Sequence, residues 1–160
     1  GFYLELRTIL SNKDNWGKYL HILSIDMDKL KYINDTFGHA EGDFAIITLS
    51  KCIIEVCRGY DASSICSRFG GDEFTCTILS DYPDAYQVET ISQAISEAIS
   101  QASGVSKQPY PITASVGLSS CQLSANLDIE SLIIAADKKM YQNKEARKKA
   151  RKSEETVFHD

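Results

Sequence analysis

The chain has 160 residues, 43% of them hydrophobic, and a formal net charge of −5. This length predicts one domain, over residues 1–160, that is large enough to bury a real core. No apolar run approaches the roughly 18 residues of a membrane span, and no charged-then-apolar leader with a cleavage site is present. We therefore expect no membrane contact by this segment. We expect a cytoplasmic domain, whose parent chain can still be membrane-anchored.

The five cysteines favour a reducing compartment over a disulfide framework. They are an odd number, they form no CxxC pair, and they fall mainly in apolar segments, at Cys52, Cys57, Cys66, Cys76 and Cys121. Buried reduced thiols in a cytosolic setting are the expected state, and a zinc site is disfavoured.

Apolar patterning predicts alternating strands and helices along the chain. In order, the expected elements are a strand at 20–25, a helix-like stretch that begins at 26–28, a helix at 44–58, strands at 64–69 and 74–79, a helix at 88–99, a strand at 112–118 and a C-terminal helix. This order, β-α-β-β-α-β-α, suits a mixed central sheet with helices packed around it. We interpret Trp16, His21 and His159 as packing or surface residues.

Basic residues are concentrated near the C-terminus. Residues 138–152 contain eight Lys and Arg and one acid, which leaves nine bases and 21 acids in the rest of the chain. Apolar residues at helical spacing predict an amphipathic helix packed on the body: Ile129, Leu132, Ile133, Ala136 and Met140. A solvated helix terminus explains its basic end, with Arg147, Lys149, Arg151 and Lys152, and residues from about 149 to 160 form a basic C-terminal tail. A nucleic-acid-binding arm is an alternative, but the acidic body argues against a nucleic acid partner.

Residues 68–74, Arg-Phe-Gly-Gly-Asp-Glu-Phe, are the most informative segment. Strand-like residues flank the glycine pair, so Gly70 and Gly71 should occupy a hairpin turn, where glycine lets a ligand approach the backbone. Asp72 and Glu73 would then project into open space as neighbouring anions that a cation or a proton must neutralise. A solvated acidic hairpin tip is the alternative interpretation.

A second acidic segment follows the predicted strand at 20–25. A carboxylate at the end of a buried strand occupies a position that ligand sites favour. Asp28 is explained by capping of the following helix, but Asp26 is not. A magnesium site that also binds phosphates needs only one or two carboxylates with backbone oxygen and water, so Asp26 with Asp72 would suffice.

Two motifs together resemble the GGDEF family of diguanylate cyclases. They are residues 26–39, Asp-Met-Asp-Lys-Leu-Lys-Tyr-Ile-Asn-Asp-Thr-Phe-Gly-His, and residues 68–74. They occur in the family's order and spacing, with Gly42 and Asp43 between them, and the resemblance extends from about residue 15 to about residue 148. It implies a palm-like nucleotidyl-cyclase fold of the α+β type that binds one GTP. Two such domains would meet as a transient homodimer and convert two GTP into cyclic di-GMP and two pyrophosphates.

The resemblance also implies roles for the acidic residues. Asp26 and Asp72 match the family's metal-binding carboxylates, with the Met27 backbone carbonyl as a further ligand of Mg²⁺ or Mn²⁺. Asp72 and Glu73 are the expected catalytic residues, and the pattern does not assign which of them helps to remove the proton of the attacking hydroxyl. Catalysis would come from positioning and from metal-stabilised charge.

Asn34 and Asp43 match the positions that contact the guanine edge. An aspartate suits this task because it accepts hydrogen bonds from both the ring N–H and the exocyclic amine, a donor pair that adenine lacks. Taken alone, Asn34 is explained by a helix C-terminal turn before Gly38, and Asp43 by a helix N-cap. His39 belongs to the family motif, where a structural or a ligand role suits it.

Three lysines match phosphate-binding positions: Lys31, Lys144 and Lys148. In the family, a lysine and an arginine four residues later bind the triphosphate, and Lys144 matches the position of that lysine. Lys148 stands where arginine is usual. Lysine keeps the charge but loses the bidentate fork, so weaker phosphate binding is expected.

An inhibitory product site is expected to be absent. Many family members carry Arg-x-x-Asp five residues upstream of the glycine pair, but here Asp61-Ala62-Ser63-Ser64 occupies that stretch. Both charged anchors are missing, so product inhibition by this route should not occur.

The resemblance leaves two classes of function open. The intact acidic set favours a diguanylate cyclase. The alternative is a catalytically weak or inactive GTP-binding regulatory module, which Lys148 and the abrupt start at Gly1 favour. That start also predicts a fragment of a longer signalling protein, whose sensory domain would be a further partner.

Overall fold

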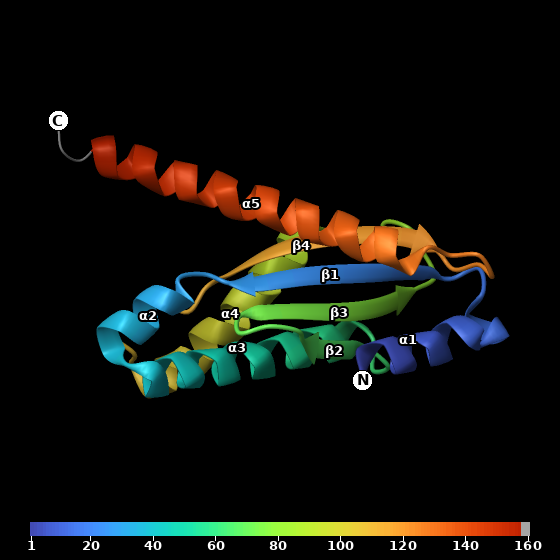
Figure 1. Cartoon of the computed structure of the whole chain (residues 1–160), viewed down its shortest axis with the longest axis horizontal. Helices are drawn as coiled ribbons and strands as arrows, with labels where there is room; N and C mark the ends of the chain where they lie inside the picture. Colours follow the sequence, from blue (N-terminus) through green and yellow to red (C-terminus); the bar gives the residue numbers. More distant parts are fainter. Residues whose placement is uncertain (158–160) are drawn as a thin grey trace.

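The computed structural model describes residues 1–157, although not the side chains of residues 105 and 106. In chain order, the elements are α1 (Phe2–Ser11), the short 3-10 helix η1 (Lys13–Asn15), β1 (Tyr19–Met27), α2 (Leu30–Phe37), α3 (His39–Tyr60), β2 (Ile65–Arg68), β3 (Glu73–Ser80), α4 (Val88–Ser106), β4 (Ala114–Gln122) and α5 (Ile129–Val157) (Figure 1). The prediction for His159 lies outside the described residues.

The four strands form one sheet in the order β2-β3-β1-β4. Every pairing between these strands is antiparallel, so the expectation of a mixed sheet is wrong. The connection from β1 to β2 passes over β3, and the connection from β3 to β4 passes over β1, which is the split βαβ arrangement. The expected α+β class, with a hairpin that carries the glycine pair, is confirmed.

Strand β1 is central and buried on both faces, because its side chains alternate between two hydrophobic clusters. Leu23, Ile25 and Met27 pack in the cluster that includes residues of α2, α3 and α4. Leu20 and Ile22 pack in the cluster that includes residues of α1 and α5. The last residues of β1 therefore lie between helices on both sides of the sheet.

Helix α5 runs beside β4 and continues past the sheet toward the C-terminus (Figure 1). Its N-terminal half is fixed on the sheet by side-chain hydrogen bonds. Ser24 donates to Asp137 at 3.1 Å, and Asn143 donates to the Val116 carbonyl oxygen at 2.7 Å. These bonds set the position of α5 along β1 and β4, and so the position of Lys144.

The predicted elements are present with shifted boundaries. The helix expected at 44–58 begins earlier, at His39, and the strand expected at 112–118 begins at Ala114 and ends at Gln122. Helix α1 was not predicted, although its Phe2 and Leu6 are buried. None of the described helices combines the length and apolar character that crossing a bilayer requires.

Candidate functional site

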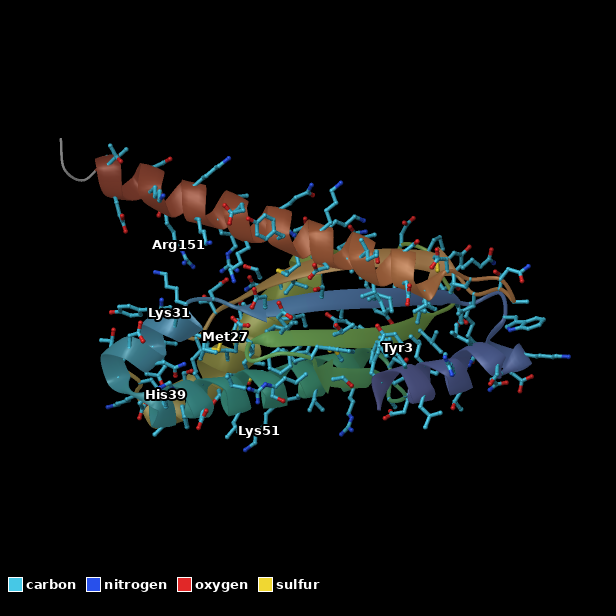
Figure 2. All side chains as sticks on the ribbon, viewed as in Figure 1. Tyr3, Met27, Lys31, His39, Lys51 and Arg151 are labelled. Carbon is cyan, nitrogen blue, oxygen red and sulfur yellow. The ribbon has the colours of Figure 1, made fainter. Side chains whose placement is uncertain are left out.

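The acidic residues meet where β1 ends beside the turn between β2 and β3. Asp26 is paired in register with Glu73 on β3 and with Ser115 on β4. The Met27 backbone N–H donates to the Asp72 carbonyl oxygen at 2.9 Å, so the turn is attached to the end of β1. Figure 2 labels Met27 at this end of the sheet. The structure thus brings Asp26, Met27, Asp72 and Glu73 together.

The turn itself is held by hydrogen bonds to its own backbone. The Phe69 N–H donates to the Glu73 carbonyl oxygen at 2.9 Å, and Arg68 Nε donates to the carbonyl oxygens of Gly70 and Gly71, each at 3.1 Å. The Glu73 side chain folds back over Gly70, since a Cβ placed on Gly70 would lie 3.3 Å from Glu73 Oε2. Gly70 therefore leaves room for the second acidic side chain.

Lys144 reaches Asp26 from α5. Its Nζ lies 2.7 Å from Asp26 Oδ2, and the two side chains are only 19% and 14% exposed. Burial raises the pKa of the Asp26 carboxyl, the ion pair with Lys144 opposes this shift, and the negative charge of Asp72 adds to it. One ammonium group therefore neutralises only part of the negative charge gathered here.

The residues present fit a divalent metal ion. Asp26 Oδ1 is buried and accepts no hydrogen bond from the described residues, whereas Oδ2 is paired with Lys144. A buried oxygen without a partner is costly, and a cation shared with Asp72 would remove this cost. Carboxylate and carbonyl oxygens are the donors that Mg²⁺ and Mn²⁺ prefer, and Asp26, Asp72 and the Met27 backbone supply them.

Asp28 does not cap α2, so the capping interpretation is wrong. The N-cap residue is Lys29, which has a left-handed backbone (φ 59°), and no side chain caps the helix. Asp28 is buried and instead accepts hydrogen bonds from Thr113 Oγ1 at 2.9 Å and Ser115 Oγ at 2.8 Å. Arg147 Nη1 lies 3.3 Å from Asp28 Oδ2. The second aspartate therefore anchors α5 and β4 beside the acidic centre.

The basic end of α5 is divided between this site and solvent. Arg147 was grouped with the solvated helix end, and that interpretation is wrong, because Arg147 pairs with Asp28. Lys148 is 57% exposed and pairs with Glu145 of the same helix at 3.3 Å. Lys31 is exposed on the first turn of α2 (Figure 2). Of the three predicted phosphate-binding lysines, the structure pairs one, Lys144, with an acidic residue of the centre.

Asn34 and Asp43 lie near one another on α2 and α3. The Asn34 carbonyl accepts from the Gly38 N–H at 2.9 Å, which fits the expected helix C-terminal turn. The Asn34 side chain packs against Gly42, where a Cβ would lie 1.7 Å from Asn34 Oδ1. Asp43 is exposed inside α3, whose N-cap is Gly38, so the N-cap interpretation of Asp43 is wrong. His39 is the exposed first residue of α3 (Figure 2).

Asp61 has a structural role between α3 and β2. Its Oδ1 accepts hydrogen bonds from the backbone N–H and the hydroxyl of Ser63, at 2.9 and 2.6 Å. Its Oδ2 accepts from the Leu79 N–H at 3.0 Å. A carboxylate is therefore fixed in the stretch where many family members have the arginine of the product site.

Comparison with known proteins finds relatives for most of the chain. The family model described as diguanylate cyclase, GGDEF domain, matches residues 1–150. The chain is 30% identical over 135 residues to the biofilm architecture maintenance protein MbaA of Vibrio cholerae, which covers 82% of this chain and 17% of that protein. It is 32% identical over 130 residues to diguanylate cyclase A of Treponema denticola, with 79% and 33% covered. The chain thus spans a third or less of the length of these two relatives.

A solved structure agrees with the fold. The active GGEEF domain of a diguanylate cyclase from Vibrio cholerae superposes with a TM-score of 0.60 at 26% identity, over 89% of this chain and 85% of that one. The expected palm-like cyclase fold is thereby confirmed.

Proposed function

The chain belongs to the GGDEF domain family of diguanylate cyclases, and we propose that this domain condenses two GTP into cyclic di-GMP and two pyrophosphates. In each half of the reaction the 3′-hydroxyl of one GTP attacks the α-phosphate of the other. A new P–O bond forms, the bond to pyrophosphate breaks, and the hydroxyl proton passes to a base. The observation that carries the proposal is the buried Oδ1 of Asp26, which has no hydrogen-bond partner among the described residues although Lys144 pairs with Oδ2 and the charge of Asp72 lies nearby.

Two overlapping groups of residues would bind the metal ion and assist the proton transfer. Asp26, Asp72 and the Met27 carbonyl would hold Mg²⁺ or Mn²⁺, which neutralises the charge of the phosphates when it is bound. Asp72 and Glu73 lie on the hairpin turn and the first residue of β3, where an incoming hydroxyl can reach them. We assign the catalytic roles to these two residues.

The basic and polar residues would bind the rest of the nucleotide. Lys144 is already partly buried in the centre, so its ammonium can pair with a phosphate oxygen at little further desolvation cost. Lys31 and Lys148 are exposed and would extend this contact along the triphosphate. Asn34 and Asp43 would accept and donate hydrogen bonds at the guanine edge.

One domain supplies one such centre, so the symmetric condensation requires a second copy of the domain with its own GTP. We therefore propose a transient homodimer as the active form. Because GTP is a cytoplasmic nucleotide and the relatives are several times longer than this chain, we also propose a cytoplasmic output domain of a longer signalling protein.

A GTP-binding regulatory module without turnover is the second candidate. The observation that favours it is Lys148, which lacks the guanidinium fork and pairs with Glu145. Such a module would bind GTP and metal but would release no pyrophosphate.

Product analysis separates the two candidates. The domain, at concentrations that permit dimerisation, is incubated with GTP and Mg²⁺ or Mn²⁺, and cyclic di-GMP is identified by chromatography and mass spectrometry. Asp72→Asn should lower the rate by roughly a thousandfold or more, since it removes a ligand of the charge-neutralising ion. Asp81→Asn, an exposed acid outside the site, is the control and should be neutral. Metal-dependent GTP binding without product would support the regulatory module, and near wild-type turnover of Asp72→Asn would refute the metal assignment.

A further inference from the structure

Three thiols from separate elements converge beneath the hairpin. Cys57 lies near the end of α3, Cys66 on β2 and Cys76 on β3, and their sulfur atoms all lie within 4.8 Å of one another. Cys66 and Cys76 are register partners, so their side chains leave the sheet on the same face. Cys57 and Cys76 are buried, and Cys66 is partly exposed. All three are free thiols.

A hydroxyl without a partner lies beside this cluster. Ser64 precedes Cys66 by two residues, and its hydroxyl is close enough to interact with the Cys66 thiol. The Ser64 Oγ is buried and has no geometric hydrogen-bond partner in the part of the chain that the structure describes. The three sulfur atoms therefore lie within interaction range of one another, with the Ser64 hydroxyl at one side of the cluster.

We propose that Cys57, Cys66 and Cys76 form a binding site for Zn²⁺, with the Ser64 hydroxyl as the fourth ligand, directly or through one water. A tetrahedral zinc site has Zn–S distances of about 2.3 Å, which places its sulfur atoms about 3.8 Å apart, so each pair has to close by about 1 Å at most. Three thiols lose three protons to solvent as the ion enters, and the complex carries one net negative charge. The positive charge of the Arg58 guanidinium, which already favours the ionised form of Cys66, offsets the negative charge of the complex.

A cation suits the cluster better than a disulfide does. A disulfide would join two of the sulfur atoms and leave the third, together with Ser64, unused. Soft thiolate donors select zinc over Mg²⁺, so this site would not compete with the oxygen site formed by Asp26 and Asp72. The CxxC spacing that usually marks zinc in a sequence is absent, because these ligands come from three different elements.

Bound zinc would join the two parts of the proposed active site. Helix α3 carries Asp43, and strands β2 and β3 carry the hairpin of Asp72 and Glu73. A single ion that ties Cys57 to both strands would fix these elements relative to one another. The site does not depend on the proposed cyclase activity.

The test is a titration of reduced, metal-free protein with Cd²⁺ in excess Mg²⁺, followed by the thiolate-to-cadmium charge-transfer absorbance. The band should saturate at one ion per chain, and Zn²⁺ should displace it. Cys66→Ser, the least buried of the three ligands, should weaken binding by about tenfold or more. Cys52→Ser and Cys121→Ser remove thiols outside the cluster and should leave the band and the affinity unchanged. Loss of the band in these controls, or an unchanged affinity in Cys66→Ser, would overturn the proposal.

X-ray absorption of the zinc-loaded wild-type protein needs no variant and so avoids any failure of a variant to fold. It should show three sulfur neighbours at about 2.3 Å and one lighter ligand. A shell of oxygen and nitrogen alone would overturn the site. Ser64→Ala should lower the zinc affinity while the three-sulfur shell remains, and unchanged affinity would show that the fourth ligand is wrongly assigned.

Discussion

Gly117 on β4 lies directly against the backbone of Met140 on α5. A Cβ placed on Gly117 would stand 2.2 Å from the Met140 nitrogen and 2.1 Å from the Ala136 carbonyl oxygen. No side-chain movement can relieve contacts with backbone atoms, so the close approach of α5 depends on this glycine. Lys144 follows Met140 by one helical turn, and its contact with Asp26 depends on the same approach.

Gly117→Ala should therefore destabilise the domain and move Lys144. We expect a loss of about 3 kcal/mol in the free energy of unfolding, measured by urea denaturation, since the added methyl group overpacks a helix-on-strand contact. Gly59→Ala is the matched control: its Cβ would meet nothing within 4 Å, and alanine is the better helix former. Equal stability of the two variants would contradict the packing described.

Lys148→Arg should strengthen GTP binding several-fold. Arginine restores a planar fork that can make two parallel hydrogen bonds to a phosphate, and the side chain at 148 is free to leave its exposed pair with Glu145. Titration calorimetry with GTP and Mg²⁺ measures the change. Lys149→Arg, on the next and exposed position, should leave the affinity unaltered. If Lys148→Arg bound GTP with wild-type affinity, residue 148 would not be part of the proposed triphosphate site.

GTP should bind much more tightly than ATP, and Asp43→Ser should erode the preference. Loss of the charged acceptor leaves guanine donors without a partner, at a cost of about 1–3 kcal/mol. Competition between the two nucleotides for the domain gives the ratio directly. Asp35→Ser removes an exposed acid on α2 and is the charge-matched control. If the wild type did not discriminate between the nucleotides, Asn34 and Asp43 would not be the base-binding residues.

Stability should fall as the pH drops below about 6.5, because His21 is buried in the neutral form. Its ring nitrogens lie 2.6 Å from the hydroxyls of Ser80 and Ser120, and burial lowers the pKa of His21 from its usual 6.5. Above that pH the His21 side chain is neutral in both the folded and the unfolded protein. Below it the unfolded chain binds a proton that the folded protein resists, so the free energy of unfolding decreases, by at most about 1.4 kcal/mol per pH unit.

Urea denaturation at pH 7.5 and 5.5 measures this slope. His21→Gln should flatten the pH dependence, whereas His39→Gln, at an exposed position, should leave it unchanged. A slope that survives the substitution of His21 would have to come from another group.

Cyclic di-GMP should inhibit turnover only by competing with GTP. The carboxylate of Asp61 is fixed by Ser63 and Leu79 where an arginine would be needed to pair with the product's phosphate. Initial rates over a grid of GTP and product concentrations distinguish the cases. Saturating GTP should restore the full rate. A maximal rate that falls with product despite saturating GTP would reveal a separate inhibitory site.

The acidic centre could be predicted because its signals are local. Asp26 ends an apolar strand, and Asp72 follows a glycine pair between two strand-like runs, so the sequence alone indicates that both carboxylates leave rigid elements. The relative direction of the strands, in contrast, could not be predicted from local sequence. Whether β1 lies antiparallel to β3 depends on how the crossovers pass, which the pattern of apolar residues does not encode, and a mixed sheet was expected for that reason.

The missed features are those that need tertiary neighbours. Asp28 has the sequence signature of a helix cap, but the hydroxyls of Thr113 and Ser115 and the guanidinium of Arg147 compete for it. The only local hint was the position of Arg147 three residues after Lys144, on the same side of the helix. Helix α1 was detectable, since Phe2 and Leu6 are four residues apart.

Gly42 restricts the mutations that the proposed guanine-binding residues Asn34 and Asp43 can accept. The residue is helical and has no need of a left-handed backbone, and glycine in a helix costs about 1 kcal/mol relative to alanine. The volume that a methyl group would occupy is instead filled by the amide of Asn34. A substitution at 42 would thus expel Asn34 from its place while the fold persists. The proposed contact of Asn34 with guanine would then depend on a neighbour that contributes no side chain of its own.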